Sequence, residues 1–381
     1  MKIGHIGAYD RNLGDNIALL NVRKEFDKHI PRIEWTTIDI GNTFWSKENS
    51  IEHIKNYFDQ WKYDALVVGG GGLVESHGYD FNTAYEHKGV PSTHYKLPFN
   101  KEILESIGIP VFFAGVGINY FRGKEGFTDR ALKSFKETIE YSSVFSLRND
   151  GSINKLKELG TDPSLTWSLD PPKFIDKLVE KVIEIPDPGL IFDDIVKTKT
   201  NFERNFIQPA FNANEVHNNN RYKNKENIEK LVKFANTNNL IAVPHCHKDF
   251  RHFKNFLFEK QNLIDLLRYH NTDTLSRIYL DFDSIVAFRG HGQLMSIGRN
   301  IPGIYFSTQD KLRDFSLLNG FENYNVDIDE DSWYEKLNDK FQRILKDPSY
   351  VKEWYEIREE KMPKWRDQFK YFVLECKKHL Y

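Results

Sequence analysis

Ser284-Ile-Val-Ala-Phe-Arg289-Gly290-His291 is the stretch that best predicts the fold, because an apolar run closes on an arginine, a glycine and a histidine. We expect a strand over residues 284–288, a helix over 292–299 and a further strand over 303–307. Such a unit builds a parallel α/β sheet, whose ligands bind outside the carboxyl ends of the strands. The free N–H groups of the following helix favour an anion there. The alternative is a surface loop in which the arginine pairs with a carboxylate.

The same alternation of strands and helices runs through the rest of the chain. In the first half we expect strands at residues 3–8, 33–40, 64–68, 110–117 and 144–147, and helices at 16–28, 50–61, 101–107, 129–141 and 151–159. After a segment rich in proline between residues 170 and 189, it restarts with a strand at 205–212, a helix at 224–236 and a strand at 240–243. Two amphipathic helices at 333–380, broken near Asp347-Pro348, form the tail.

This order predicts two Rossmann-like, doubly wound α/β domains that face a cleft, a GT-B-like architecture, with a C-terminal helical tail. We expect an N-terminal domain at residues 1–175, on the acceptor side and with part of the donor site, and a linker at 176–203. The C-terminal domain, with the donor site, is expected at 204–330, and residues 331–381 are expected to pack back on the body. The less favoured role for this tail is contact with a membrane surface.

Composition limits the choice of partners. The 381 residues contain 53 Lys plus Arg against 55 Asp plus Glu, so no overall charge attracts nucleic acid. Cys246 and Cys376 are too few for a disulfide framework and suit a reducing compartment. No apolar run approaches the roughly 20 residues of a spanning helix. We expect a cytoplasmic protein, and peripheral association with the inner face of a membrane or with glycan assembly machinery stays compatible with the sequence.

Two glycine-containing segments follow predicted strands of the first half. In Asn12-Leu-Gly14-Asp15-Asn16, Gly14 lets the backbone approach a ligand and Asp15 can cap the next helix, although a capped turn without ligand is an equal alternative. It is not the Gly-x-Gly-x-x-Gly pattern of NAD sites. Gly69, Gly70, Gly71 and Gly72 indicate close passage of a substrate or of another chain segment. We assign the last three to acceptor binding; no P-loop follows them.

Polar residues follow two further strands. Arg148 can bind a phosphate or carboxylate with two parallel hydrogen bonds, and its alternative is structural pairing with a carboxylate. His245-Cys246-His247-Lys-Asp249 carries possible metal ligands, but alternate residues of an extended segment point to opposite faces. We therefore expect no metal site there. A loop at the cleft edge is the preferred interpretation, with His245 and Asp249 as acceptor-binding candidates.

These motifs occur in the order of a known family. Asn12-Leu-Gly-Asp-Asn, Gly69-Gly-Gly-Gly-Leu, Gly115-Val-Gly-Ile, Leu147-Arg-Asn-Asp-Gly-Ser, Leu169-Asp-Pro and Arg289-Gly-His together resemble the polysaccharide pyruvyltransferase family over residues 1–308. The resemblance implies a GT-B-like fold and transfer of pyruvate from phosphoenolpyruvate, a co-substrate, to a sugar as a cyclic ketal, with no further cofactor. It places Asp15, Arg148, Arg289, Gly290 and His291 around the donor, with His291 as proton donor. From the chemistry of the residues we add Gly14 to the donor site and Asp15 to the catalytic residues, where it can orient a hydroxyl or His291.

The chemistry of these residues suits that role. Phosphoenolpyruvate has an anionic group at each end, which two arginines can hold, and ketal formation moves protons, which a histidine gives and takes near neutral pH. The acceptor is expected in a capsular, exopolysaccharide or wall glycan or its precursor, as an oligosaccharide or lipid-linked form, and a hexose and an acidic sugar such as Kdo both fit. One rival is a GT-B glycosyltransferase that uses a nucleotide sugar. The other is a non-catalytic carbohydrate-binding descendant, which Asn16 and Asn149 favour because the family commonly has acidic residues there.

Overall fold

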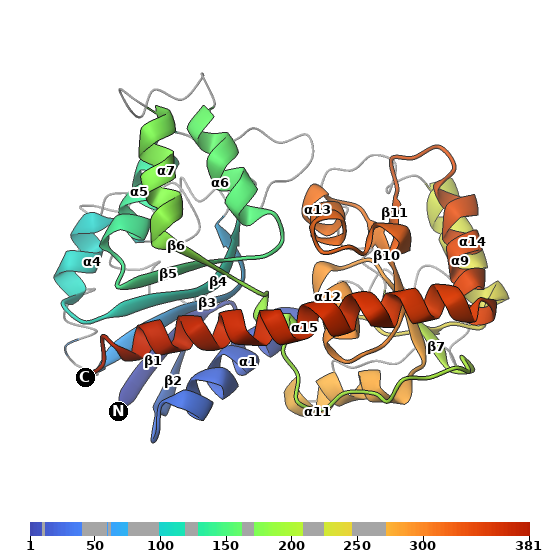
Figure 1. Cartoon of the computed structure of the whole chain (residues 1–381), viewed down its shortest axis with the longest axis horizontal. Helices are drawn as coiled ribbons and strands as arrows, with labels where there is room; N and C mark the ends of the chain where they lie inside the picture. The colour runs from blue at the N-terminus through green and yellow to red at the C-terminus, as the bar shows by residue number, and fades with distance from the viewer. Residues whose placement is uncertain are drawn as a thin grey trace.

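The computed structural model describes residues 1–9, 12–39, 59, 62–74, 99–118, 129–161, 171–208, 225–245 and 272–381. Two parallel sheets dominate these residues, one of six strands in the order β2-β1-β3-β4-β5-β6 and one of five in the order β11-β10-β9-β7-β8. Figure 1 shows the two sheets side by side with helices around each. The predicted pair of α/β domains with a helical tail is confirmed.

The N-terminal domain is built on the six-stranded sheet. Its strands are β1 (Lys2–Gly7), β2 (Glu34–Asp39), β3 (Ala65–Val74), β4 (Val111–Ile118), β5 (Val144–Arg148) and β6 (Val182–Ile185). Its helices are α1 (Leu13–His29), α4 (Lys101–Ile107), α5 (Asp129–Tyr141), α6 (Ser152–Thr161) and α7 (Pro171–Lys181). The short helix η1 (Pro188–Leu190) begins the connection to the second domain. The helix expected at residues 50–61 lies outside the described residues except for residue 59.

The C-terminal domain is built on the five-stranded sheet. Its strands are β7 (Asn205–Gln208), β8 (Ile241–Ala242), β9 (Ser284–Ala287), β10 (Gly303–Ser307) and β11 (Asn325–Asp327). Its helices are α9 (Lys225–Thr237), α11 (Thr272–Arg277), η4 (Ile278–Asp281), α12 (Gly290–Gly298), α13 (Asp310–Leu318) and η5 (Glu322–Tyr324). The tail consists of α14 (Trp333–Lys346) and α15 (Pro348–Lys377), which meet at the predicted break.

Both faces of the first sheet are covered. Along β3, Ala65 and Val67 belong to one apolar core, which reaches from the side chains of α1 and α15 into the C-terminal domain. Leu66 and Val68 belong to a second core on the other face, with side chains from α4, α5, α6 and α7. Successive side chains of a strand point to opposite faces, so a buried run such as this one supports a layer on each side.

The two sheets share one strand order. Numbered within each domain, both contain the order 2-1-3-4-5, and the first sheet adds β6 at its edge. Strand order reverses between β1 and β3 in the first sheet and between β7 and β9 in the second. Ligands of doubly wound sheets bind at such reversal points, outside the carboxyl ends of the strands. The reversal points are therefore the places where a site is expected.

The boundary that we expected at residue 175 comes too early. Strand β6 pairs with β5, and α7 contacts α5 and α6, so residues 171–185 complete the N-terminal domain. The cause lies in Pro171 and Pro172, which the sequence suggested as chain breakers but which stand in the first turn of α7. A helix tolerates proline there because its first N–H groups have no partner within the helix. The connection between domains runs instead from Pro186 to Arg204.

The tail helix α15 clasps the N-terminal domain, as predicted. On the C-terminal domain, Trp354 Nε1 donates to the hydroxyl of Tyr305 on β10 at 3.1 Å, and the helix then crosses to the first domain (Figure 1). There the Phe372 ring lies 6.2 Å from the Phe26 ring of α1, and Lys377 Nζ donates to the carbonyl of His29 at 3.0 Å.

In the described part of the chain, no helix is long and apolar enough to cross a membrane.

Candidate functional site

The candidate site lies where the two reversal points of strand order meet. The chain that leaves β1 enters α1, which carries Asp15 in its first turn. The chain that leaves β9 enters α12, which carries His291 in its first turn. His291 Nε2 lies 3.7 Å from Asp15 Oδ1, so the two domains bring together a histidine and a carboxylate that are far apart in sequence. This contact joins the two residues predicted to be catalytic.

His291 is held in a buried setting between charges of both signs. Its side chain is 12% exposed, and among the described residues no hydrogen-bond partner reaches its Nε2 atom. Burial lowers the pKa of His291, while the charges of Asp15 and Asp187 oppose that effect. The nearby cations Arg148 and Lys311 act in the same direction as burial. The imidazole is therefore neutral near pH 7 and can gain a proton when a further negative charge arrives beside it.

Gly14 makes room for His291. A Cβ atom added at Gly14 would stand 2.1 Å from His291 Cβ and 2.2 Å from its Cγ. The glycine is thus required by contact between the starts of α1 and α12. Gly14 thus lies next to the His291 ring, and its approach to a donor stays a prediction.

Asn12, not Asp15, caps α1. The side chain of Asn12 accepts from the backbone N–H of Gly14 at 2.9 Å, which satisfies one of the free donors at the helix start. The helix begins at Leu13, earlier than predicted, and so leaves the Asp15 carboxylate on its first turn. Freed from capping, Asp15 faces His291 and the glycine run, where a Cβ atom added at Gly71 would lie 3.1 Å from Asp15 Oδ1.

The glycine run forms the end of β3 and packs against other chain segments. Gly69, Gly70 and Gly71 all have positive φ angles, which glycine adopts readily. A Cβ atom at Gly69 would stand 2.4 Å from the carbonyl oxygen of Ala114 on β4. One at Gly70 would stand 3.0 Å from the backbone of Ala18 on α1. Close passage of chain segments thus explains these two glycines, and acceptor binding by Gly70, Gly71 and Gly72 stays a prediction.

Arg148 is buried between two carboxylates. Its Nε donates to Asp150 at 2.5 Å and its Nη1 to Asp187 at 2.8 Å. Burial acts to lower the pKa of Arg148, but the two carboxylates outweigh it and the pKa is raised. The structural pairing considered as the alternative is therefore present, and direct donor binding by Arg148 stays a prediction. The guanidinium also lies over Gly117, where a Cβ atom would stand 2.2 Å from Arg148 Nε.

The sequence interpretation missed Asp187. Its side chain is fully buried, accepts from Arg148 and from the N–H of Gly189 at 2.8 Å, and caps η1. The available signal is a lone acidic residue between prolines in Pro186-Asp187-Pro188-Gly189, a segment that the sequence otherwise marks only as a chain break. Asp187 connects Arg148 to the segment that passes between the domains, and its charge acts on His291.

Asn149, the departure from the family pattern, also joins the two domains. The side-chain amide of Asn319 donates to the Asn149 carbonyl at 3.1 Å, and Asn149 Oδ1 accepts from the Asp187 N–H at 3.1 Å. The acidic partner of Arg148 stands one residue later, at Asp150. Asn149 thus leaves Arg148 paired, and its own Nδ2 donates across the domains to Asn319 Oδ1 at 3.4 Å.

Arg289 stands at the end of β9, at the N-cap of α12, as predicted. Its backbone N–H donates at 3.0 Å to Oε1 of the buried Gln208, which ends β7 on the other side of the reversal point. A Cβ atom at Gly292 would stand 2.6 Å from the same oxygen. Gln208 was missed because it belongs to a predicted strand and only the sheet order places it beside Arg289.

His245 lies in the core behind this site. Its ring is fully buried and its Nε2 lies 2.6 Å from the hydroxyl of Tyr279. Burial, followed by the charges of Arg289 and His291, lowers the pKa of His245 well below its ordinary value. Its carbonyl accepts from the N–H of Leu13 at 3.1 Å, which ties the start of α1 to the second domain. The geometry gives His245 a supporting place, and Asp249 lies outside the described residues.

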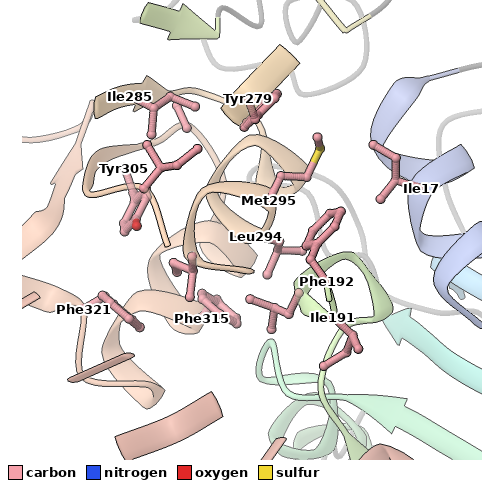
Figure 2. Packing of buried hydrophobic residues seen from close by; sticks show 14 of the residues in the cluster. Ile17, Ile191, Phe192, Tyr279, Ile285, Leu294, Met295, Tyr305, Phe315 and Phe321 are labelled. Carbon is pink, nitrogen blue, oxygen red and sulfur yellow. The ribbon is translucent and has the colours of Figure 1, made fainter. Parts of the chain in front are cut away.

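Apolar packing fixes α12 between the domains. Figure 2 shows Leu294 and Met295 of α12 near Phe192 and Ile191, with Ile17 of α1 on the opposite side. All five side chains belong to one buried core. At the far end of α12, Arg358 of α15 donates to the carbonyls of Ile297 at 2.6 Å and Gly298 at 3.2 Å. The helix start that carries His291 is thus held by packed neighbours.

In the described part of the chain, no group of three or more His, Cys, Asp or Glu side chains lies close enough together to hold a metal ion.

Comparison with known proteins identifies the family of the chain. A family model described as polysaccharide pyruvyl transferase matches residues 12–310. A comparison with curated proteins gives no match. Similar solved structures include the UDP complex of MnaA from S. aureus, with 9% identity over 93% of this chain and 90% of that one and a TM-score of 0.48. The UDP-GlcNAc 2-epimerase from Neisseria meningitidis has 12% identity over 93% and 94%, with a TM-score of 0.48. The glycotransferase of kitacinnamycin has 10% identity over 100% and 99%, also at 0.48. The family match includes both Asp15 and His291.

Proposed function

Because the chain belongs to the polysaccharide pyruvyl transferase family, we propose that it transfers the pyruvyl group of phosphoenolpyruvate to a sugar of a capsular, exopolysaccharide or wall glycan or its precursor. The product is a cyclic pyruvate ketal, and inorganic phosphate is released. The observation that carries the proposal is the contact between His291 and Asp15, one from each domain, at 3.7 Å. It supplies a proton-transfer group where the strand ends of both sheets meet.

The reaction needs one proton at carbon and one on phosphate. The methylene carbon of phosphoenolpyruvate takes a proton, and C2 becomes electron-poor. One sugar hydroxyl bonds to C2, the C2–O bond to phosphate breaks, and a second hydroxyl of the same sugar bonds to C2. The two sugar hydroxyls lose one proton each. One of these accounts for the proton gained by the methylene carbon and the other leaves on phosphate, so atoms and charge balance. We assign the first proton to His291, which then recovers one from a hydroxyl.

We assign the other charged residues of the site to holding His291 and to balancing the negative charge of the donor. Asp15 stabilises His291 in its protonated, imidazolium form, because the negative charge of its carboxylate raises the pKa of the ring. Arg289, next to His291 at the start of α12, is assigned to the donor anion. Arg148 already has two carboxylate partners, so we assign it to orientation of the Asp187 segment against His291, with any donor contact made through its remaining N–H groups.

Incubation with phosphoenolpyruvate and a panel of glycan acceptors tests the proposal. We expect release of inorganic phosphate together with an acceptor mass gain that matches one pyruvate ketal. Release of a nucleoside diphosphate from a nucleotide sugar would instead identify a glycosyltransferase. Tight sugar binding with no phosphate release would identify a carbohydrate-binding protein.

Replacement of His291 by alanine tests its assigned role. The loss of a general acid typically slows a reaction by about 10²–10⁴-fold, so we expect phosphate release by the His291→Ala enzyme to fall by that factor. His29→Ala is the matched control, because His29 pairs with Glu25 at the far end of α1. A His291→Ala enzyme that keeps wild-type turnover, with the acceptor product unchanged, would refute the assignment.

A further inference from the structure

A pocket of about 350 Å³ lies at the boundary between the two domains. Its walls come from three parts of the chain, namely Asn154 and Lys157 of α6, Leu318 at the end of α13, and Lys364 and Gln368 of the tail helix α15. In Figure 1, α6 and α13 stand on the same side of α15, one in each domain. The volume falls within the range of about 300–1,000 Å³ that is usual for small-molecule sites. The two domains and the tail thus border a space of ligand size.

The pocket lies apart from the site of His291. The start of α13 stands next to the start of α12, because a Cβ atom at Gly290 would lie 3.6 Å from Leu312 Cδ2. Leu318 and Asn319, which line the pocket, stand at the opposite end of this helix of nine residues. Such a helix is roughly 13 Å long. None of the described residues that we assign to the reaction lines the pocket, so a ligand bound there is additional to the donor and the acceptor.

The charge of the pocket is positive. Lys157, Lys361 and Lys364 line it together with one carboxylate, Glu184 of β6. Lys361 pairs with Glu360 at 2.9 Å, whereas no ion pair of Lys157 or Lys364 is found among the described residues. Partial burial raises the pKa of the Glu184 carboxyl, and the charges of Lys364 and Lys157 oppose that rise. Both ammonium groups are therefore close to one carboxylate, and three cations stand against one anion.

The uncharged lining of the pocket suits a sugar ring. Asn154 and Gln368 bring side-chain amides from two different helices. An amide has both an acceptor and donors, and a sugar hydroxyl uses both. Leu318 is 52% exposed and, with Ile153, adds apolar surface for the C–H face of a ring. The pocket thus matches a ligand that has hydroxyls, an apolar face and a negative charge.

We propose that this pocket is a second saccharide site, in which Lys157 and Lys364 bind the carboxylate of an acidic sugar of the glycan. The amides of Asn154 and Gln368 bond to hydroxyls of the same sugar. The inference rests on the proposed function in one respect: transfer of a pyruvyl ketal places a carboxylate on the sugar, so the product belongs to this class of ligand. A glycan chain held there stays on the enzyme between one transfer and the next.

Titration of three saccharides into the full-length protein, followed by NMR, tests the second site. The probes are a hexose that carries a pyruvate ketal, glucuronic acid, and a neutral methyl hexoside. We expect the two acidic sugars to bind, more weakly at high salt, and the neutral one to bind least. Lys157→Gln and Lys364→Gln should each weaken binding of the acidic sugars by about two- to fivefold, and the double variant by about tenfold. Lys370→Gln removes the same charge from an exposed position of α15 outside the pocket, so it should bind as the wild type does.

Arg289→Gln separates this site from the reaction site, where the product also binds. Loss of ketal binding in Arg289→Gln, with normal binding in the lysine variants, would overturn the second site. A wild-type protein that binds no acidic sugar, or binds the neutral hexoside equally well, overturns it as well. Lysine variants that melt earlier but bind as the wild type does would show that the two lysines only support the fold. If the double variant alone loses the acidic sugars, the site stands even when no acceptor yields a ketal, and only the transfer assignment fails.

Discussion

At the scale of single residues, three histidines that are largely shielded from solvent behave differently. Burial, aided by Arg23, lowers the pKa of His5 to about 3. Its Nδ1 accepts from Arg23 and its Nε2 lies 3.1 Å from the Gly69 carbonyl, an arrangement that suits the neutral ring. His245 is buried beside Tyr279. Only His291 faces a carboxylate, Asp15, and an expected ligand, so only its proton is placed to respond to binding.

Proton uptake on donor binding follows from this setting. Burial keeps the pKa of His291 below its ordinary value of 6.5 in the free protein, and an added anion raises it. At a pH between the free and bound pKa values, binding of phosphoenolpyruvate should therefore take up a proton, up to about one per site. Calorimetry in two buffers of different ionisation enthalpy measures this number. Phosphate release should fall as pH rises through the bound pKa, because the acid form is then lost.

His291→Gln separates this effect from protonation of the donor itself. The amide does not titrate, so the variant should lose the part of the uptake that belongs to the imidazole. Equal uptake by wild type and variant would show that the proton goes elsewhere.

At the scale of elements, the contact between the starts of α1 and α12 sets the site. Gly14 has no side chain because His291 Cβ, Cγ and Nδ1 would lie 2.1, 2.2 and 2.5 Å from its Cβ. Arg358 holds the opposite end of α12. Neither helix can move away without loss of the apolar packing around Met295, so a clash at Gly14 has no easy relief.

Gly14→Ala should therefore destabilise the protein. Overpacking typically costs about 1–3 kcal/mol, partly offset because alanine favours a helix by about 1 kcal/mol over glycine. In a His291→Gly background the three contacts are gone, and the same substitution should be neutral or stabilising. Chemical denaturation of the four proteins of this cycle measures the coupling. An equal cost of Gly14→Ala in both backgrounds would contradict the proposed contact.

At the scale of the whole molecule, α15 joins two domains that each have their own sheet. It contacts α14 on one side and α1, β5 and β6 on the other. The buried Phe372 anchors it on the first domain, while its neighbour Tyr371 is 54% exposed. The angle between the domains, and with it the distance from His291 to Asp15, depends on this bridge together with the packing of η1 on α12.

Phe372→Ala should lower the free energy of unfolding by about 3–5 kcal/mol, the usual cost of removing a buried phenyl ring. Tyr371→Ala, at an exposed position of the same helix, should change it by about 0.5 kcal/mol or less. Denaturant titration of both variants gives the comparison. Similar small effects for the two residues would mean that α15 does not hold the first domain in solution.

The sequence by itself determined the helices and strands, and it determined the sheet edge at which the candidate functional residues lie. The expected bounds of the helices at 101–107 and 129–141 and of the strand at 303–307 agree with α4, α5 and β10, because local periodicity and flanking glycine or proline residues define such elements. The sheet edge that carries Arg289 and His291 was also predictable, since a parallel strand followed by a helix always delivers its last residues to that edge.

Only the tertiary structure decided which residues meet there. Arg148 pairs with Asp187, 39 positions away, and Gln208 meets Arg289 across a reversal of strand order. Gly14 and His291 come from different domains. Local preferences carry no information about such pairs, because each depends on the order of strands in a sheet or on the docking of one sheet against the other. That docking is fixed by long-range packing of α1, η1, α12 and α15, whose contacts exist only once the whole chain has folded.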